Sequence, residues 1–248
     1  QIEIDFKEPN ISIKNKLEYG NISNLKGLIF LSYLNQNIEI NYKLNNNLII
    51  IKSPDNNNDI KIDSIIELRP FYLKSNINLN KQNLNFLTDE LIYSLLSFDA
   101  ELLGNLNGEI KLYLTNIENE IIRNGQISFD ISQKTIKLRK ALFNLGEIGT
   151  IESEIKYVEN NGDLIFNSIN SLLIKNKKRF ARKFQIKPSK ILDLDRFYFK
   201  IEKNISTGST TIFDIKTNLS KNEDKIKLKY KIKNSQELKS LVKNILDN

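Results

Sequence analysis

Residues 108–174 contain a long alternation of apolar and polar side chains, and this alternation constrains the fold more than any other feature. Period-two spacing places every second side chain on the same face of a β-strand. The apolar residues of the first two runs are Ile110, Leu112 and Leu114, followed by Ile127, Phe129 and Ile131. The stretch therefore predicts several strands that share one apolar face and one polar face.

The Asn124-Gly125 pair between these two runs predicts a hairpin turn, because both residues tolerate a positive φ angle. The first third of the chain carries similar runs, for example residues 38–44, which an all-asparagine turn at 45–47 follows. Short strands separated by short polar turns favour a meander over βαβ units. We therefore expect a mainly β fold, in which a long curved antiparallel meander sheet carries an apolar inner groove.

Two helices interrupt the predicted strands. Residues 88–103 have apolar side chains at helical spacing, with Thr88 as the expected N-cap and Gly104 as the residue that ends the helix. Residues 235–247 form a second amphipathic helix that begins with a serine cap. Lysines alternate with apolar residues over 225–233, which predicts a strand whose charges suit a sheet edge.

The strand rhythm continues through the chain, so we expect a single elongated β domain over residues 1–248. Its first part, residues 1–86, consists of strands. Residues 87–234 hold the internal helix and the remaining strands, and residues 235–248 form the C-terminal helix.

Histidine and cysteine are absent from the 248 residues, which removes the usual general base and the commonest metal ligands. Acidic pairs such as Asp193 and Asp195 lie two residues apart, so in a strand they share a solvated face. Glycine-rich phosphate loops are also absent. We expect no enzymatic activity, no cofactor and no metal site. Because the chain begins with Gln1 and contains no Met, we expect a fragment or a processed form.

The net charge of +7 is unevenly distributed, with −4 over residues 1–124 and +11 over residues 125–248. Residues 175–190 are densely basic and include two phenylalanines four positions apart, Phe180 and Phe184. The basic residues that we single out are Lys177, Lys178, Arg179, Arg182 and Lys183. Three interpretations of this basic run are open. It could be a solvated face, it could contact anionic lipid headgroups, or it could bind nucleic acid with its rings stacked on bases.

An apolar face formed by so many strands must be covered by another part of the protein or must bind a ligand or partner. One internal helix spans too little of it to act as a second layer. Either a second sheet closes the face, which gives a structural or adhesive β-sandwich, or a hydrophobic groove remains for a ligand or partner. The sequence pattern alone leaves both possibilities open.

Residues 83–219 resemble the C-terminal region of the AsmA-like family of Gram-negative envelope proteins. The similarity lies in the helix before Gly104 and in five further segments. These segments are LNGEIKLYL (106–114), RNGQISFDI (123–131), ALFNLGEIGTIESEIKY (141–157), SINSLLIKN (168–176) and RFARKFQI (179–186). They are structural signatures and include no catalytic motif.

The resemblance implies a periplasmic protein attached to the inner membrane through a segment absent from this sequence. It further implies a curved sheet with a lipid groove and a role in phospholipid transport or outer-membrane maintenance. On this hypothesis, phospholipid or another acyl-chain lipid lies along Ile110, Leu112, Leu114, Ile127, Phe129 and Ile131. A membrane surface is the further contact for the basic residues, and we expect no nucleic-acid partner.

Overall fold

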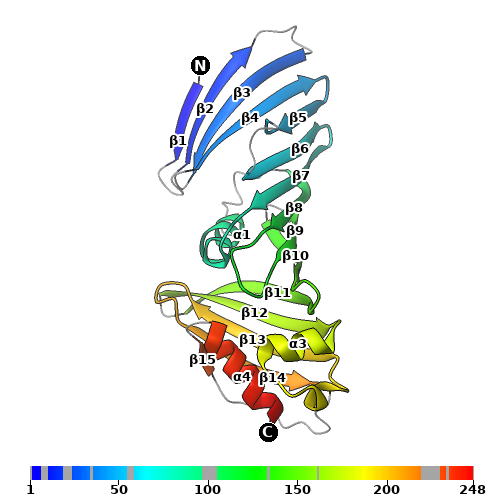
Figure 1. Ribbon diagram of the computed structural model, residues 1–248. Coiled ribbons are helices and arrows are strands. Elements are labelled where there is room, and N and C mark those ends of the chain that lie inside the picture. Colours follow the sequence, from blue (N-terminus) through cyan, green and yellow to red (C-terminus); the bar gives the residue numbers. More distant parts are fainter. Residues whose placement is uncertain are drawn as a thin grey trace. The chain divides into compact units, whose positions relative to one another are not determined.

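The computed structural model describes residues 2–6, 11–18, 24–33, 36–54, 59–96, 105–132, 135–160, 162–218, 230–232 and 235–247. The strands within these residues form one open sheet, hydrogen-bonded in sequence order from β1 to β15 (Figure 1). The fold is thus mainly β, as predicted. The strands are β1 (Ile2–Phe6), β2 (Ile11–Glu18), β3 (Asn24–Tyr33), β4 (Gln36–Asn45), β5 (Leu48–Lys52), β6 (Ile60–Leu68), β7 (Phe71–Asn80), β8 (Asn107–Thr115), β9 (Asn124–Ser132), β10 (Thr135–Asn144), β11 (Gly149–Asn160), β12 (Asp163–Ile174), β13 (Arg196–Asn204), β14 (Thr210–Thr217) and β15 (Tyr230–Ile232).

One pair of neighbouring strands departs from the expected antiparallel meander. β7 and β8 run parallel, with Leu73 opposite Gly108 and Leu79 opposite Leu114. Parallel neighbours require a crossover connection, which is usually helical. The segment between these strands supplies it, because it contains a π-helix, η1 (Phe86–Leu91), and a short α-helix, α1 (Ile92–Leu96). The internal helix predicted from the sequence is therefore the reason that strict antiparallel order fails.

The start of this internal helix lies earlier than predicted. The Asn83 side-chain oxygen accepts a hydrogen bond from the Phe86 backbone N–H at 2.7 Å, which makes Asn83 the capping residue. The Thr88 hydroxyl instead donates to the Leu84 carbonyl at 3.0 Å, so Thr88 lies inside the helix. The second half of the predicted helix, with Gly104, lies outside the described residues.

The turns agree with the sequence at one position and differ at another. Asn46 has a φ angle of 50° between β4 and β5, as the run of asparagines predicted. The Asn124-Gly125 pair, however, forms the first two residues of β9 and does not form a turn. Asn116, with a φ angle of 51°, leads instead into a loop that the Asn119 side chain stabilises. The hydrogen bonds that the Asn119 side chain accepts therefore determine where this turn lies.

The basic run at 175–190 forms a helix, α3 (Lys177–Phe184), followed by a 3₁₀ turn, η2 (Pro188–Ile191). The Asn176 side chain caps α3 by accepting a hydrogen bond from the Arg179 N–H at 3.0 Å. The C-terminal helix, α4 (Ser235–Asp247), has the predicted boundaries. β15 occupies one edge of the sheet, while residues 219–229, which include part of the predicted lysine-rich strand, lie outside the described residues.

The chain divides into two compact units, which we describe separately. Unit 1 comprises Gln1–Gln82, Leu91–Asn116 and Gln126–Arg139, and unit 2 comprises Asn83–Glu90, Ile117–Gly125 and Lys140–Asn248. The expected single elongated domain stays a prediction.

The core of unit 2 lies between its strands and the helices α3 and α4. Phe180 of α3 is fully buried, with its ring 4.6 Å from that of Phe184 and 5.8 Å from that of Phe197 on β13. Leu241 of α4 belongs to the same cluster, and Leu238 and Val242 pack against it. The apolar side chains at 238–242 therefore pack on the core, as the helical spacing of these residues predicted.

Candidate functional site

Unit 1 carries one apolar sheet face whose residues follow from the strand register. On β6 and β7, Ile62 pairs with Ile77 and Ile66 pairs with Leu73. Directly opposed residues share a face, so each pair extends the same apolar surface. We call this surface the apolar face of unit 1. From β5 to β8 it consists of Ile49, Ile51, Ile60, Ile62, Ile66, Leu73, Ile77, Leu79, Ile110, Leu112 and Leu114, with one buried serine pair, Ser64 and Ser75.

The opposite face of the same strands has a different chemistry. There, Lys52 lies opposite Asp63, and Leu48 lies opposite Glu67. The apolar exceptions on β5 and β6 are Leu48, Ile50 and Ile65, of which Leu48 and Ile65 are exposed. Most pairs on this second face include a charged residue, whereas no charged residue stands on the apolar face between β5 and β8. The two faces of one sheet are thus chemically distinct, as alternation predicts.

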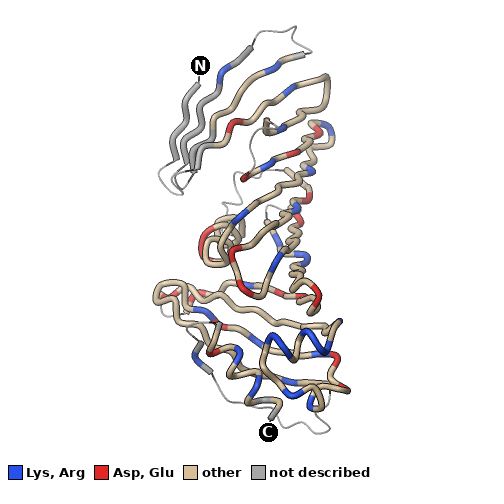
Figure 2. The backbone as a smooth tube through the Cα atoms, in the orientation of Figure 1, with Lys and Arg blue, Asp and Glu red and all other residues tan. Residues whose placement is uncertain are grey.

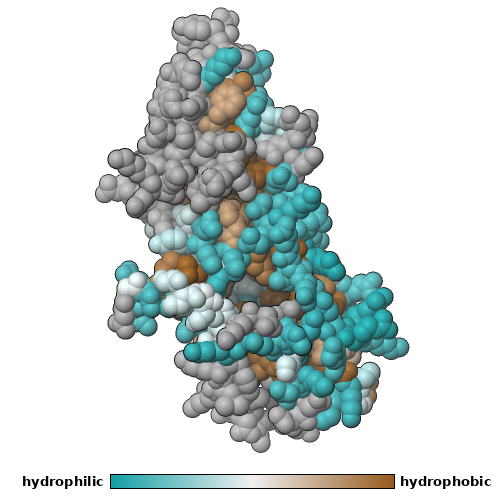
Figure 3. All heavy atoms as spheres, turned by 60° about the vertical axis from the view of Figure 1, so that its left-hand side comes forward, coloured by the Kyte–Doolittle hydropathy of each residue, from teal (hydrophilic) through white to brown (hydrophobic). Residues whose placement is uncertain are grey.

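Side-chain exposure varies along the apolar face. At β8 and β9 the apolar side chains are buried, while at β5 to β7 most of them are half-buried. We call the half-buried set the accessible stripe, and it consists of Ile49, Ile51, Ile62, Ile66, Leu73 and Ile77. At its end, Phe71 is 41% exposed. Figure 3 shows scattered hydrophobic surface at the height of these strands, beside hydrophilic residues.

The six residues predicted to line a lipid groove lie together on β8 and β9 but are not accessible. Leu112, Ile127 and Phe129 are 0% exposed, and Ile110, Leu114 and Ile131 are also buried. A lipid would reach them only if the atoms that cover them moved. An aspartate at Leu112 or Phe129 would bury an uncompensated charge and unfold the sheet. Their role in lipid binding stays a prediction, and the accessible stripe is the surface that a ligand can reach directly.

Sequence reasoning did not select the accessible stripe. The signal for this stripe is nevertheless present in the sequence. Ile60 and Ile62 alternate with polar residues, and Leu73 and Ile77 lie four positions apart, a spacing that places both on one face of a strand. Alternation identifies a face, but it does not say which part of that face another element covers.

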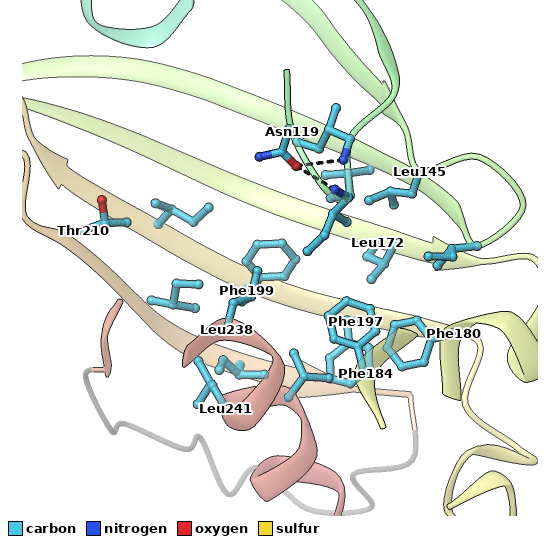
Figure 4. A pocket seen from close by; sticks show the side chains of 18 of the residues that line it. Asn119, Leu145, Leu172, Phe180, Phe184, Phe197, Phe199, Thr210, Leu238 and Leu241 are labelled. Atoms are coloured by element: carbon cyan, nitrogen blue, oxygen red, sulfur yellow. Dashed lines mark hydrogen bonds between the residues drawn. The ribbon is translucent and has the colours of Figure 1, made fainter. Parts of the chain in front are cut away.

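Unit 2 carries a second apolar site, a cavity between its sheet and α4 (Figure 4). The cavity has a volume of about 410 Å³, and all of its lining residues are apolar except Asn119 and Thr210. We call it the cavity of unit 2. Phe197 and Phe199 approach it from β13, Leu238 and Leu241 from α4, and Phe180 and Phe184 from α3. Figure 4 shows these side chains converging from the sheet and the helices.

Such a cavity is larger than the voids of ordinary protein cores. Its walls offer few polar partners, so water inside it would form few hydrogen bonds with the protein. Leu238 and Val242 of α4 line the cavity and are half-buried, so this wall is partly accessible to solvent.

A cluster of polar side chains connects η1 to the strands of unit 2 through hydrogen bonds and an ion pair. The Lys203 ammonium lies 2.7 Å from the Asp89 carboxylate, and it also donates to Asn85 at 2.9 Å. The Tyr157 hydroxyl donates to the Thr88 backbone carbonyl. Burial raises the pKa of Tyr157 far above its usual value, and the nearby Asp89 carboxylate raises it further. Tyr157 therefore stays protonated and serves as a hydrogen-bond donor.

The predicted basic residues all lie on α3, which Figure 2 shows as a concentration of positive charge. Lys177 pairs with Asp195 at 2.9 Å, and Arg179 pairs with Glu147 at 2.7 Å. Lys183 donates to the Glu120 backbone carbonyl. Lys178 and Arg182 are exposed and form no ion pair with a described residue.

The two phenylalanines of α3 do not stand beside these charges on the surface. Phe180 and Phe184 are 0% and 5% exposed, because they point into the core of unit 2. The idea that these rings stack on nucleic-acid bases is therefore wrong for the described structure. What α3 presents to solvent is positive charge alone.

Within the described ranges, no group of three or more acidic side chains is arranged to hold a metal ion. Every buried side-chain nitrogen and oxygen there has a hydrogen-bond partner. The described helices include none with the length and apolar character needed to cross a bilayer. Comparisons with protein-family models, curated proteins and solved structures found no match for this chain.

Proposed function

We propose that this chain is a non-enzymatic lipid-binding protein, and that acyl chains lie along the accessible stripe of unit 1. The observation that carries the proposal is the register of β5 to β8, which gathers isoleucine and leucine on one face without a charged residue. Its half-buried side chains offer apolar surface at a sheet face. A contiguous apolar surface of this kind is typical of a ligand or partner site.

The physical basis of binding would be hydrophobic. Each methylene that leaves water contributes about 0.8 kcal/mol, so an acyl chain needs no polar anchor along the stripe. Ser64 and Ser75 offer no such anchor, because their hydroxyls bond to each other at 2.6 Å. The stripe would therefore select for apolar chain length and not for a headgroup.

Phospholipid is the ligand that the family resemblance favours, with transport within the bacterial envelope or outer-membrane maintenance as the role. A periplasmic location and attachment to the inner membrane follow from the same resemblance. The exposed charges of Lys178 and Arg182 suit contact with anionic headgroups at a membrane surface. An open sheet in place of two packed sheets also favours this function over a structural β-sandwich.

Extraction of a fluorescent phospholipid from vesicles by the purified full chain tests the proposal. Ile62→Asp places a charge on the accessible stripe and should abolish extraction. Ile65→Asp is the matched control, since it makes the same change on the same strand but on the opposite face. Equal extraction by both variants, each shown to be folded by circular dichroism, would contradict the proposal.

A further inference from the structure

The cavity of unit 2 adjoins a second, polar pocket. This polar pocket has a volume of about 420 Å³ and shares Phe184 with the cavity. Its other lining residues are Glu120, Gln185, Gln236, Lys239, Ser240 and Lys243. On α4, Leu238 and Val242 line the cavity, while the adjacent Lys239 and Lys243 line the polar pocket. One helix therefore contributes an apolar wall to one site and a basic wall to the other.

The charge around the polar pocket is positive. The Lys239 ammonium lies 3.1 Å from the Glu120 carboxylate, so this pair is close to neutral. The Lys183 ammonium donates to the Glu120 backbone carbonyl at 2.9 Å and adds a further positive charge. Lys243 is exposed and has no ion-pair partner among the described residues. The pocket thus complements an anionic group that sits beside an apolar cavity.

We infer that the cavity of unit 2 binds one acyl chain of an anionic amphiphile, whose headgroup lies in the polar pocket beside Lys239 and Lys243. The cavity volume falls within the usual range of ligand sites, about 300–1,000 Å³. Its walls are almost wholly apolar, so it excludes water-like ligands and accepts a hydrocarbon chain. A long-chain fatty acid is the simplest ligand that has both features.

This site does not depend on the accessible stripe, because every lining residue of the cavity and the polar pocket belongs to unit 2. The two sites can therefore be tested separately. Ile62→Asp removes the proposed binding surface of unit 1 and provides the background for measurements on unit 2.

The test is equilibrium dialysis of radiolabelled palmitate against the delipidated full chain carrying Ile62→Asp. We expect one saturable site. Val242→Phe should fill the cavity and weaken binding at least about tenfold, the size expected of overpacking an apolar site. Asn244→Phe is the matched control, since it adds the same ring to an exposed position of the same helix and should leave binding unchanged.

A second pair of measurements tests the headgroup. Lys239→Gln combined with Lys243→Gln should weaken palmitate binding roughly threefold, as for a partly exposed ion pair, and leave hexadecanol binding unchanged. Lys156→Gln combined with Lys216→Gln removes the same charge from exposed strand positions and should have no effect.

Absence of saturable palmitate binding, or equal binding by the Val242→Phe protein, would overturn the inference. Should Val242→Phe fail to fold by circular dichroism, Ile201→Phe fills the cavity from the sheet side and decides the question. Equal loss of palmitate and hexadecanol binding in the lysine variant would overturn the assignment of the headgroup.

Discussion

The two units of this protein use the same strand pattern but complete it differently. In unit 2, α3 and α4 pack on the apolar face and bury Phe180 and Leu241. In unit 1, the accessible stripe on β5 to β7 stays half-buried. Alternation therefore produces an apolar face, and a helix with a matching apolar side determines whether that face becomes a core.

Substitutions on a covered face should destabilise the protein far more than substitutions on an open face. Phe180→Ala should lower the free energy of unfolding by about 3–5 kcal/mol, because it removes a fully buried ring and leaves a cavity. Ile62→Ala on the accessible stripe should cost only about 1 kcal/mol, since part of its side chain is already in water. Urea denaturation of each variant measures both values. Similar losses for the two variants would mean that the faces do not differ in packing.

A smaller change in stability is expected from the polar cluster that connects η1 to the strands of unit 2. Because the pKa of Tyr157 is raised in the folded state, folding binds its proton more tightly than the unfolded chain does. Its contribution to stability is therefore fully present below the unfolded pKa of about 10 and is lost as the pH rises above that value. Tyr157→Phe removes the hydroxyl that donates to Thr88, so its stability should decline less steeply with pH.

The measurement is the difference in melting temperature between the wild type and Tyr157→Phe from pH 8 to pH 11. The other tyrosines and the lysines titrate in both proteins, so the difference isolates this one phenol. A difference that stays constant with pH would show that the Tyr157 hydroxyl is not buried as described.

The smallest effect concerns the start of a covering helix. Asn176→Ala removes the cap of α3 and should destabilise unit 2 by about 1 kcal/mol. Asn176→Asp keeps an acceptor at the same position and serves as the control. Thermal unfolding followed by circular dichroism compares the two, and equal melting temperatures for Ala and Asp would contradict the capping role.

The sequence predicted the strands and the C-terminal helix well, because their signals are local. Residues 235–247 combine a serine cap with helical spacing, and the helix has those boundaries. Strand alternation likewise predicted the shared face of Ile110 and Leu112. Such periodic patterns depend only on the geometry of the strand or helix itself.

The features that the sequence did not predict depend on contacts between distant residues. The parallel pairing of Leu73 with Gly108 requires knowing where the crossover returns, which no local pattern encodes. The burial of Phe180 among basic residues follows from its packing against Phe197, seventeen positions away. The cavity of unit 2 depends on how α4 packs against strands that are distant in the sequence.

Quantitative mass spectrometry can measure the lipids extracted from the purified full chain after expression in a bacterial host. If acyl chains lie on the accessible stripe, phospholipid is stoichiometric in the wild type and in Ile65→Asp and is strongly reduced in Ile62→Asp. Folded wild-type protein without phospholipid would contradict the claim that the accessible stripe is a lipid-binding surface.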